Sequence, residues 1–388
     1  MRILHTSDLH LGSRLHGIDR TDELFSQFEN ICEIASQQKV DVLLVAGDVF
    51  EKRGIALPEL TKKLADILAP RIREGMNVIL VPGNHDDREH FNMMNALLSL
   101  EQGYSEKVHI VKTKEILKIQ NTQFVAIPYP LHEMLQPYMA EFSGSTERNV
   151  SLSSAFAGLI RSVIDNVDPA LPAILIAHIY VAGTTTPNNY ELTYDNDIRL
   201  GKADLPILNN LKYIALGHIH QFQKIDHPIP CYYCGSMDRL NWGEKDEDKY
   251  VNVVDVFDNG DAKVTSLPLG TTPFHFIQTT ASQLENLRSM YHDLNQAFVT
   301  LEITNDTGVD PATIYRIAKD ICPRQISINI VGENEKVQKP KLSMQPRGYA
   351  ETSQKYLEEF FKDDPDLPEL QRLTSELLNE VENATTAN

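Results

Sequence analysis

Hydrophobic residues gather in short, nearly continuous runs along the first two thirds of the chain. The runs cover residues 40–46, 77–81, 173–177 and 213–216. Runs of this length without polar alternation are typical of strands that are buried on both faces of a sheet. Apolar residues recur at helical spacing before the first run, from Leu24 to Ala35, and between the first two runs, from Leu60 to Leu68. The alternation of strand and helix predicts a layered α/β domain over residues 1–265.

A smaller pattern follows this domain. Strands are predicted at 274–279, 298–303 and 325–331, with helices at 281–294 and 310–321. These elements predict a separate α/β unit over residues 270–335. Residues 336–350 are polar and contain two prolines, which favours a linker. Two amphipathic helices are expected within residues 351–383, and they either fold back on the main body or dock on a partner.

Residue types that bind metals follow the apolar runs. The motifs are Asp-Leu-His, Gly-Asp, Gly-Asn-His-Asp, Ala-His and Gly-His-Ile-His, and their candidate residues are Asp8, His10, Asp48, Asn84, His85, His178, His218 and His220. Because ligands of α/β sheets bind at the carboxyl ends of strands, these motifs predict one cleft. Two cations held together hydrolyse phosphoesters, and the carboxylate of Asp48 suits the bridging position. Mixed Asp, Asn and His ligands without thiolate favour two Mn²⁺, with Mg²⁺ also compatible.

His85 has a separate predicted role. An imidazole beside a bound phosphate donates a proton to the leaving oxygen or stabilises developing charge. Asp86 either orients this imidazole or holds the surrounding loop. The sequence leaves both alternatives open.

Charge and cysteine content bear on the possible substrate and on the cellular location. The formal net charge is −18, of which residues 351–388 contribute −7 from ten Asp or Glu and three Lys or Arg. This acidity allows a phosphodiester substrate, because a metal centre adds positive charge, but it predicts weak DNA affinity for the chain alone. Four cysteines do not suggest a disulfide framework, and Cys231 and Cys234 are interpreted as buried or half-exposed thiols. No signal peptide and no membrane span are expected, which favours the cytoplasm.

The motifs together resemble those of the calcineurin-like metallophosphoesterase superfamily. The resemblance extends to its SbcD-type nuclease subunits, through residues 1–12, 45–50, 81–86 and 214–220 and more weakly through the segment from Tyr233 to Ser236 and Glu244. It implies a four-layer α/β sandwich, a small α/β capping domain at residues 270–335 and C-terminal helices. It also implies manganese-dependent nuclease activity on DNA, as a 3′–5′ exonuclease on double strands and an endonuclease on single strands and hairpins.

The resemblance further implies roles for single residues and segments. One metal would take Asp8, His10, Asp48 and His220, and the other Asp48, Asn84, His178 and His218, with His85 as the catalytic histidine. Residues 351–383 would bind an SbcC-type coiled-coil ATPase, and the chain would form a homodimer. One departure is Glu51, near a position where some relatives carry a histidine, which puts a second catalytic histidine in doubt.

Two other functions are compatible with the same motifs. The first is a stand-alone phosphatase or cyclic-nucleotide phosphodiesterase, which needs neither the small unit nor the C-terminal helices. The second is a scaffold whose metal site has decayed, although every expected ligand is present. The chain has no phosphate-binding loop of the G-x-x-x-x-G-K-[ST] type, so ATP would be handled by a partner.

Overall fold

The computed structural model describes residues 1–51, 56–100, 102–139, 145–181, 183–184, 199–257, 260–332, 367–368 and 370–375. The chain divides into two compact units, Met1–Ile330 and Val331–Asn388. The predicted linker at 336–350 lies outside the described residues, as does most of the predicted helical segment at 351–383. Residues 370–375 within that segment are helical.

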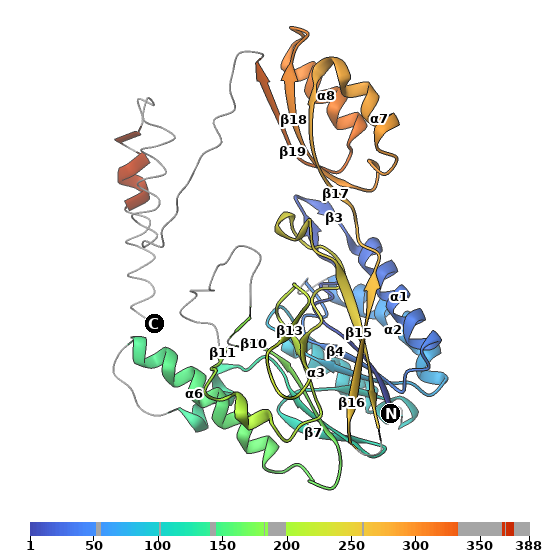
Figure 1. Ribbon diagram of the computed structural model, residues 1–388, viewed down its shortest axis with the longest axis vertical. Helices are drawn as coiled ribbons and strands as arrows, with labels where there is room; N and C mark the ends of the chain where they lie inside the picture. The colour runs from blue at the N-terminus through green and yellow to red at the C-terminus, as the bar shows by residue number, and fades with distance from the viewer. Residues whose placement is uncertain are drawn as a thin grey trace. The chain divides into compact units, whose positions relative to one another are not determined.

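Two six-stranded sheets form the sandwich of the larger unit (Figure 1). In order across the first sheet, the strands are β16 (Ala262–Leu269), β15 (Lys249–Val256), β1 (Arg2–Thr6), β4 (Val42–Ala46), β5 (Asn77–Val81) and β6 (Val108–Ile110). The second sheet contains β13 (Gln223–Ile225), β14 (Cys231–Tyr233), β12 (Tyr213–Gly217), β9 (Ala173–His178), β8 (Thr122–Ile127) and β7 (Glu115–Ile119). The four apolar runs are β4, β5, β9 and β12, and each pairs in parallel with neighbouring central strands. Antiparallel strands complete one side of the first sheet and both edges of the second, whereas β6 at the other edge of the first sheet is parallel to β5.

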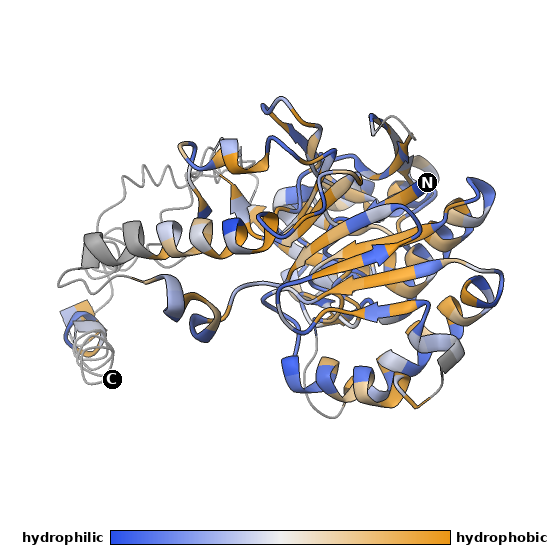
Figure 2. Ribbon diagram, turned by 90° about the horizontal axis from the view of Figure 1, so that it is seen from below, coloured by the Kyte–Doolittle hydropathy of each residue, from blue (hydrophilic) through white to orange (hydrophobic). Residues whose placement is uncertain are grey.

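The sheets pack face to face between two layers of helices. Along β4, Val42 and Leu44 belong to the cluster that also contains Ile174 of the second sheet. Leu43 and Val45, which point the other way, belong to the cluster that contains the helices covering the first sheet. Figure 2 shows the hydrophobic colour along the strands and polar colour on the outer turns of the helices. The predicted α/β sandwich of four layers is confirmed.

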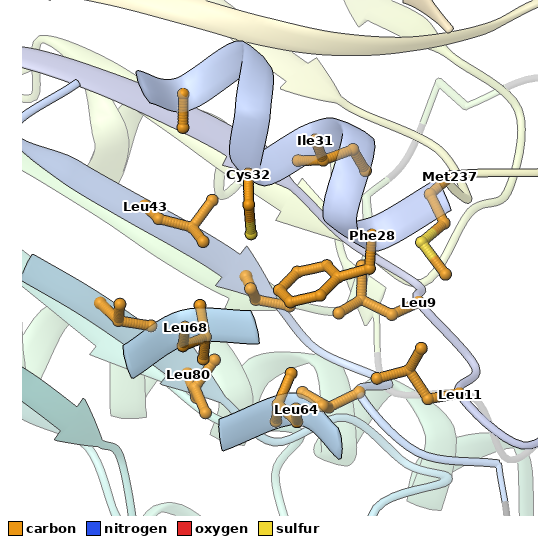
Figure 3. Packing of buried hydrophobic residues seen from close by; sticks show 14 of the residues in the cluster. Leu9, Leu11, Phe28, Ile31, Cys32, Leu43, Leu64, Leu68, Leu80 and Met237 are labelled. Carbon is orange, nitrogen blue, oxygen red and sulfur yellow. The ribbon is translucent and has the colours of Figure 1, made fainter. Parts of the chain in front are cut away.

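Amphipathic helices cover the outer faces. The principal helices are α1 (Thr21–Gln37), α2 (Leu57–Arg73), α3 (Arg88–Leu98) and α6 (Ser145–Ile164). The buried stripe of α1 includes Leu24 and Phe28, as its spacing predicts, and Figure 3 shows Phe28 packed among Leu9, Leu64 and Met237. Shorter elements are β2 (Arg14–Leu15), β3 (Ile18–Asp19), α4 (Gln102–Ser105), α5 (His132–Leu135), η2 (Gln136–Tyr138), β10 (Tyr180–Val181), β11 (Arg199–Leu200), η3 (Leu205–Leu208) and η4 (Trp242–Glu244).

The elements after residue 270 have a core of their own. They are β17 (Phe274–Thr280), η5 (Ala281–Asn286), α7 (Leu287–Met290), β18 (Phe298–Asn305), α8 (Pro311–Ile321) and β19 (Gln325–Gly332). The predicted helix at 281–294 is wrong in extent, because a 3₁₀ turn leads into a single α-turn that ends at an extended Tyr291. Leu284 of the 3₁₀ turn and Leu287 at the start of α7 lie three positions apart, and both are buried.

A buried arginine lies where the elements from β17 to β19, called the small unit below, meet the sandwich. Arg20 is 1% exposed, and its guanidinium bonds Glu23 and, at 2.9 Å, Asp238. Arg324 of the small unit also pairs with Glu23, and it lies 4.0 Å from the centre of the Phe298 ring. Charged side chains that are removed from water need oppositely charged partners, and these ion pairs supply them. No helix among the described residues is long and apolar enough to cross a membrane.

Candidate metal centre

All the predicted site residues lie at the carboxyl ends of central strands. The first sheet supplies those that follow β1, β4 and β5, which are Asp8, His10, Asp48, Asn84 and His85. The second sheet supplies those at the ends of β9 and β12, which are His178, His218 and His220. Leu9 and Leu11 alternate with the first two residues and are fully buried in the core (Figure 3). This apolar anchoring leaves the polar side chains to face the second sheet.

Asp48 lies between two groups of donor atoms. On one side, His10 Nε2 is 3.6 Å from Asp48 Oδ2 and 3.2 Å from His220 Nε2. On the other side, His178 Nε2 is 3.2 Å from Asp48 Oδ2 and 3.0 Å from Asn84 Oδ1. A carboxylate placed between two sets of nitrogen and oxygen atoms has the position of a bridging ligand.

Asp8 and His218 complete the arrangement. The backbone N–H of His218 donates to Asp8 Oδ1 over 3.0 Å, and His218 Nδ1 lies 3.2 Å from Asn84 Oδ1. His220 Nε2 is 4.0 Å from Asp8 Oδ1. Ligand atoms of Asp8, His10 and His220 lie within 4.8 Å of one another, as do those of Asp8, Asp48 and His178.

Three of the histidines are oriented by the same device. Nδ1 of His10 lies 2.5 Å from Glu51, Nδ1 of His220 lies 3.0 Å from Glu244, and Nδ1 of His178 lies 2.8 Å from the carbonyl oxygen of Ala46. Each acceptor places a proton on Nδ1 and directs Nε2 into the centre. This hydrogen bonding of the second nitrogen is the usual support of a metal-binding imidazole.

The backbone at the strand ends is adapted to this close approach. A Cβ atom on Gly83 would lie 2.0 Å from Asp48 Oδ1, and one on Gly217 would lie 1.8 Å from the carbonyl oxygen of Ala46. Four candidate ligands have positive φ, and they are Asp8, His10, Asp48 and His218. Such conformations in non-glycine residues are unfavourable and gather at functional sites.

The buried charges of the centre indicate which kind of ion it can bind. Asp8 and Asp48 are 0% and 2% exposed, and no Lys or Arg of the described chain forms a salt bridge with either. Burial opposes protonation of His178, but Asp48 raises its pKa to about 9. Burial beside His178 lowers the pKa of His218 to about 4, which leaves its imidazole neutral with a lone pair available. Two buried carboxylates beside the neutral imidazole of His218 fit divalent cations that accept oxygen and nitrogen ligands.

His85 borders the centre and contacts Glu51. Its backbone N–H donates to Asp48 Oδ1 over 2.9 Å, and its Nδ1 lies 3.1 Å from Glu51 Oε2. The bond to Glu51 raises the pKa of His85, against the effect of burial. Burial opposes ionisation of Glu51, but its bonds to His10 and His85 lower its pKa to about 2.

Asp86 holds the loop. Its carboxylate accepts the backbone N–H groups of Gly83 at 2.8 Å, Phe50 at 2.9 Å and Val49 at 3.1 Å. Of the two alternatives that the sequence leaves open, these bonds favour the structural one, and Glu51 is the residue that contacts His85.

Sequence reasoning missed Glu51 as a partner of two imidazoles, because nothing in a single sequence marks a carboxylate that joins residues 41 and 34 positions away. Glu244 was indicated only by the resemblance of its segment. Its carboxylate is buried and accepts from Lys249 at 2.7 Å and Ser236 at 3.2 Å besides His220. Burial opposes ionisation of Glu244, but the bond to His220 lowers its pKa to about 2.

Cys231 and Cys234, predicted as buried or half-exposed thiols, are buried. All four cysteines are free and buried, and Cys231 lies in β14 with Cys234 just beyond it. Burial raises the pKa of Cys231 to about 12, which suppresses the thiolate that redox chemistry and metal binding need.

Comparison with known proteins defines the class. The family model described as calcineurin-like phosphoesterase matches residues 1–222, which is more than half of the chain. The chain therefore belongs to the calcineurin-like phosphoesterase family, and its centre is that of a metal-dependent phosphoesterase.

Individual relatives are more specific. The SbcD subunit of the nuclease SbcCD from Escherichia coli strain K12 is 26% identical over 327 residues, covering 79% of this chain and 78% of the relative. The SbcD subunit of Staphylococcus epidermidis is 22% identical over 317 residues, covering 79% and 77%. The DNA double-strand break repair protein Mre11 of Aeropyrum pernix is 26% identical over 252 residues, covering 62% and 54%. The similarity to the first two extends well beyond the residues that the family model matches.

Proposed function

We propose that this chain is a manganese-dependent DNA nuclease and the nuclease subunit of an SbcC–SbcD-type repair complex. The observation that carries the proposal is the joining of acidic, amide and imidazole side chains from two sheets into one centre. The substrate class is supported by similarity, over 79% of the chain, to SbcD subunits of the nuclease SbcCD. The proposed activities are 3′–5′ hydrolysis of double-stranded ends and cleavage of single strands and hairpins.

The proposed ligands form two sets that share Asp48. One set is Asp8, His10, Asp48 and His220, and the other is Asp48, Asn84, His178 and His218. Bound there, two Mn²⁺ ions (or Mg²⁺) would neutralise the charge of the phosphodiester and activate water. The acceptors at Glu51, Glu244 and Ala46 keep each imidazole in the tautomer that points Nε2 inward.

His85 acts as the proton donor in this proposal. Glu51 accepts from Nδ1, and His85 lines the cavity beside the centre, so the proposal assigns the transferred proton to Nε2. As the bond between phosphorus and the leaving oxygen breaks, the proton on Nε2 moves to that oxygen. The negative charge of Glu51 favours the protonated imidazole from which this transfer starts.

The regions after residue 265 supply the remaining parts of the proposal. Residues 270–335 act as a capping domain that shapes access to the cleft, and residues 351–383 bind a coiled-coil ATPase that supplies ATP-driven conformational change. A homodimer and a cytoplasmic location complete it, the latter in keeping with the four free thiols. Light scattering of the purified chain tests the dimer, and a monomer at micromolar concentration would contradict it.

The activity is tested with purified protein, Mn²⁺ and three substrates: hairpin DNA, linear duplex and a small phosphomonoester. We expect cleavage of the hairpin by the chain alone, and cleavage of the duplex only with the ATPase and ATP. The His85→Gln variant should bind Mn²⁺ but lose about 10²- to 10⁴-fold in cleavage rate, as removal of a general acid does. Fast phosphomonoester hydrolysis with intact DNA would instead establish a stand-alone phosphatase. Unchanged nuclease activity in the variant would exclude His85 as the donor.

The partner is tested by deletion of residues 351–388. We expect the shortened chain to retain manganese-dependent cleavage of single strands and to lose co-purification with the ATPase. Retained co-purification would mean that the partner binds elsewhere. Loss of single-strand cleavage would assign these residues to the main body.

A further inference from the structure

A cavity of about 420 Å³ opens beside the candidate centre. Half of its lining residues belong to the centre and its supports, and they are His10, Glu51, His85 and His220. The others are Gly12, Ser13, Arg14 and Leu240, to which the proposed chemistry assigns no role. Among the described residues that line the cavity, Arg14 alone carries a permanent positive charge.

Arg14 lies in a short hairpin. It begins β2, which pairs with β3 through a turn whose central residues, His16 and Gly17, have φ of 47° and 80°. Two successive positive φ values define the tight turn that matches the twist of paired strands. At the base of the hairpin, the N–H of Ser13 donates to the carbonyl of His10 over 3.0 Å. The position of Arg14 is therefore tied to a candidate ligand.

The guanidinium of Arg14 is oriented but retains donor capacity. Its Nε and Nη2 donate to the carbonyl of Gly17 over 3.1 and 2.6 Å. Within the part of the chain that the structure describes, Nη1 makes no hydrogen bond and Arg14 forms no ion pair. A guanidinium without a carboxylate partner suits a phosphate, which accepts its N–H groups in the same plane.

Leu240 gives the same cavity an apolar surface, and it is connected to the centre through Glu244. Its backbone N–H donates to Glu244 Oε2 over 3.2 Å, and Oε1 of that carboxylate accepts from His220. The cavity therefore presents a cation and an apolar surface, both held by the residues that orient candidate ligands. A nucleotide beside a scissile phosphate offers the matching chemistry of an anionic phosphate and an apolar base.

We propose that Arg14 binds the phosphate next to the scissile one in a nucleic-acid strand, with the intervening nucleotide against Leu240. This inference rests on the proposed nuclease function and makes Arg14 a residue that favours polynucleotides over isolated phosphodiesters. The net charge of −18 gives the contact its importance, because an acidic chain must attract a polyanion through local cations.

The test compares two substrates in the full chain with Mn²⁺. One is a single-stranded oligonucleotide, and the other is bis(p-nitrophenyl) phosphate, which has one phosphate and no neighbour. For Arg14→Gln we expect KM for the oligonucleotide to rise about tenfold and its dependence on log salt to weaken by about 0.7, the contribution of one phosphate contact on a single strand. Hydrolysis of the small ester should stay within about twofold. Arg14→Lys, which keeps the charge but not the fork, should recover part of the loss.

Arg161→Gln is the matched control, because Arg161 is also exposed but lies on α6 outside the cavity. Equal losses on both substrates would overturn the inference, since Arg14 would then act on the centre itself. Unchanged kinetics on both substrates in Arg14→Gln, with a wild type that cuts oligonucleotides, would overturn the inference alone. A wild type that hydrolyses only the small ester would overturn the proposed function and the inference with it.

Discussion

Glu51 connects two imidazoles at the rim of the candidate centre. The same oxygen, Oε2, lies 2.5 Å from His10 Nδ1 and 3.1 Å from His85 Nδ1. A carboxylate accepts both N–H groups and balances the charge of a protonated imidazole, whereas an amide oxygen carries no charge. Glu51 is therefore a positioning residue for a proposed metal ligand and for the proposed proton donor.

Replacing Glu51 by Gln should lower kcat by about 10- to 100-fold, the usual effect of removing the partner of a metal-binding or catalytic histidine. Cleavage of single-stranded DNA is measured over a range of Mn²⁺ concentrations, so that loss of metal affinity is separated from loss of kcat at saturation. Glu133→Gln, at an exposed glutamate of α5, is the control. A variant with wild-type kcat and wild-type metal dependence would show that Glu51 orients neither histidine.

At the scale of elements, a cluster of charged side chains links the small unit to helix α1. Glu23 of α1 accepts from Arg20 Nε and Thr272 Oγ1, each over 2.7 Å, and pairs with Arg324 of the small unit. Burial opposes ionisation of Glu23, but these partners lower its pKa below the ordinary 4.5. Because the folded-state pKa is depressed, the stabilisation is complete above the unfolded pKa and is lost as the pH falls through the folded one.

Glu23→Gln should reduce the free energy of unfolding at pH 7 by about 1–3 kcal/mol, less than a fully buried pair because Glu23 is partly exposed. The difference from wild type should shrink as the pH falls below 4.5, where the wild-type carboxylate also becomes neutral. Thermal unfolding of the metal-free protein between pH 3.5 and 7 measures both effects. Glu29→Gln, at an exposed position of the same helix, should change little. A difference that stays constant with pH would exclude the proposed titration.

At the scale of the whole molecule, the sequence predicts the layers well and the contacts between distant parts poorly. The central strands were predictable because runs such as Val42–Ala46 are buried on both faces and contain no polar interruption. Strand β15 pairs with β1 although some 250 residues separate them in sequence, and β16 pairs with β15 at the edge of the first sheet. No local pattern in the sequence predicts this pairing. The pair of Glu23 and Arg324 spans 301 positions and is equally invisible in composition and periodicity.

The candidate centre was predictable in part for the same reason. Each ligand motif directly follows a strand, so the convergence of Asp8, Asp48 and His178 follows from the sheet rule. The supporting partners do not follow a strand pattern. Glu244 reaches His220 from a short 3₁₀ turn 24 residues later, and the acceptor of His178 is a backbone carbonyl that has no sequence signature.

The centre also links the two sheets, and this predicts how metal affects the stability of the entire fold. Asp48 belongs to the first sheet and His178 to the second, and their side chains are 3.2 Å apart. A cation held between them binds the folded chain and not the unfolded one, so it stabilises by RT ln(1 + [L]/Kd), which is about 2.7 kcal/mol at one hundred times Kd. Calorimetry of wild type in chelator and in Mn²⁺ should therefore show a higher Tm with metal. Asp48→Asn and His178→Gln should each abolish the increase, although they alter opposite sheets, whereas exposed His292→Gln should retain it. An increase that survives in both ligand variants would place the bound metal away from the junction of the sheets.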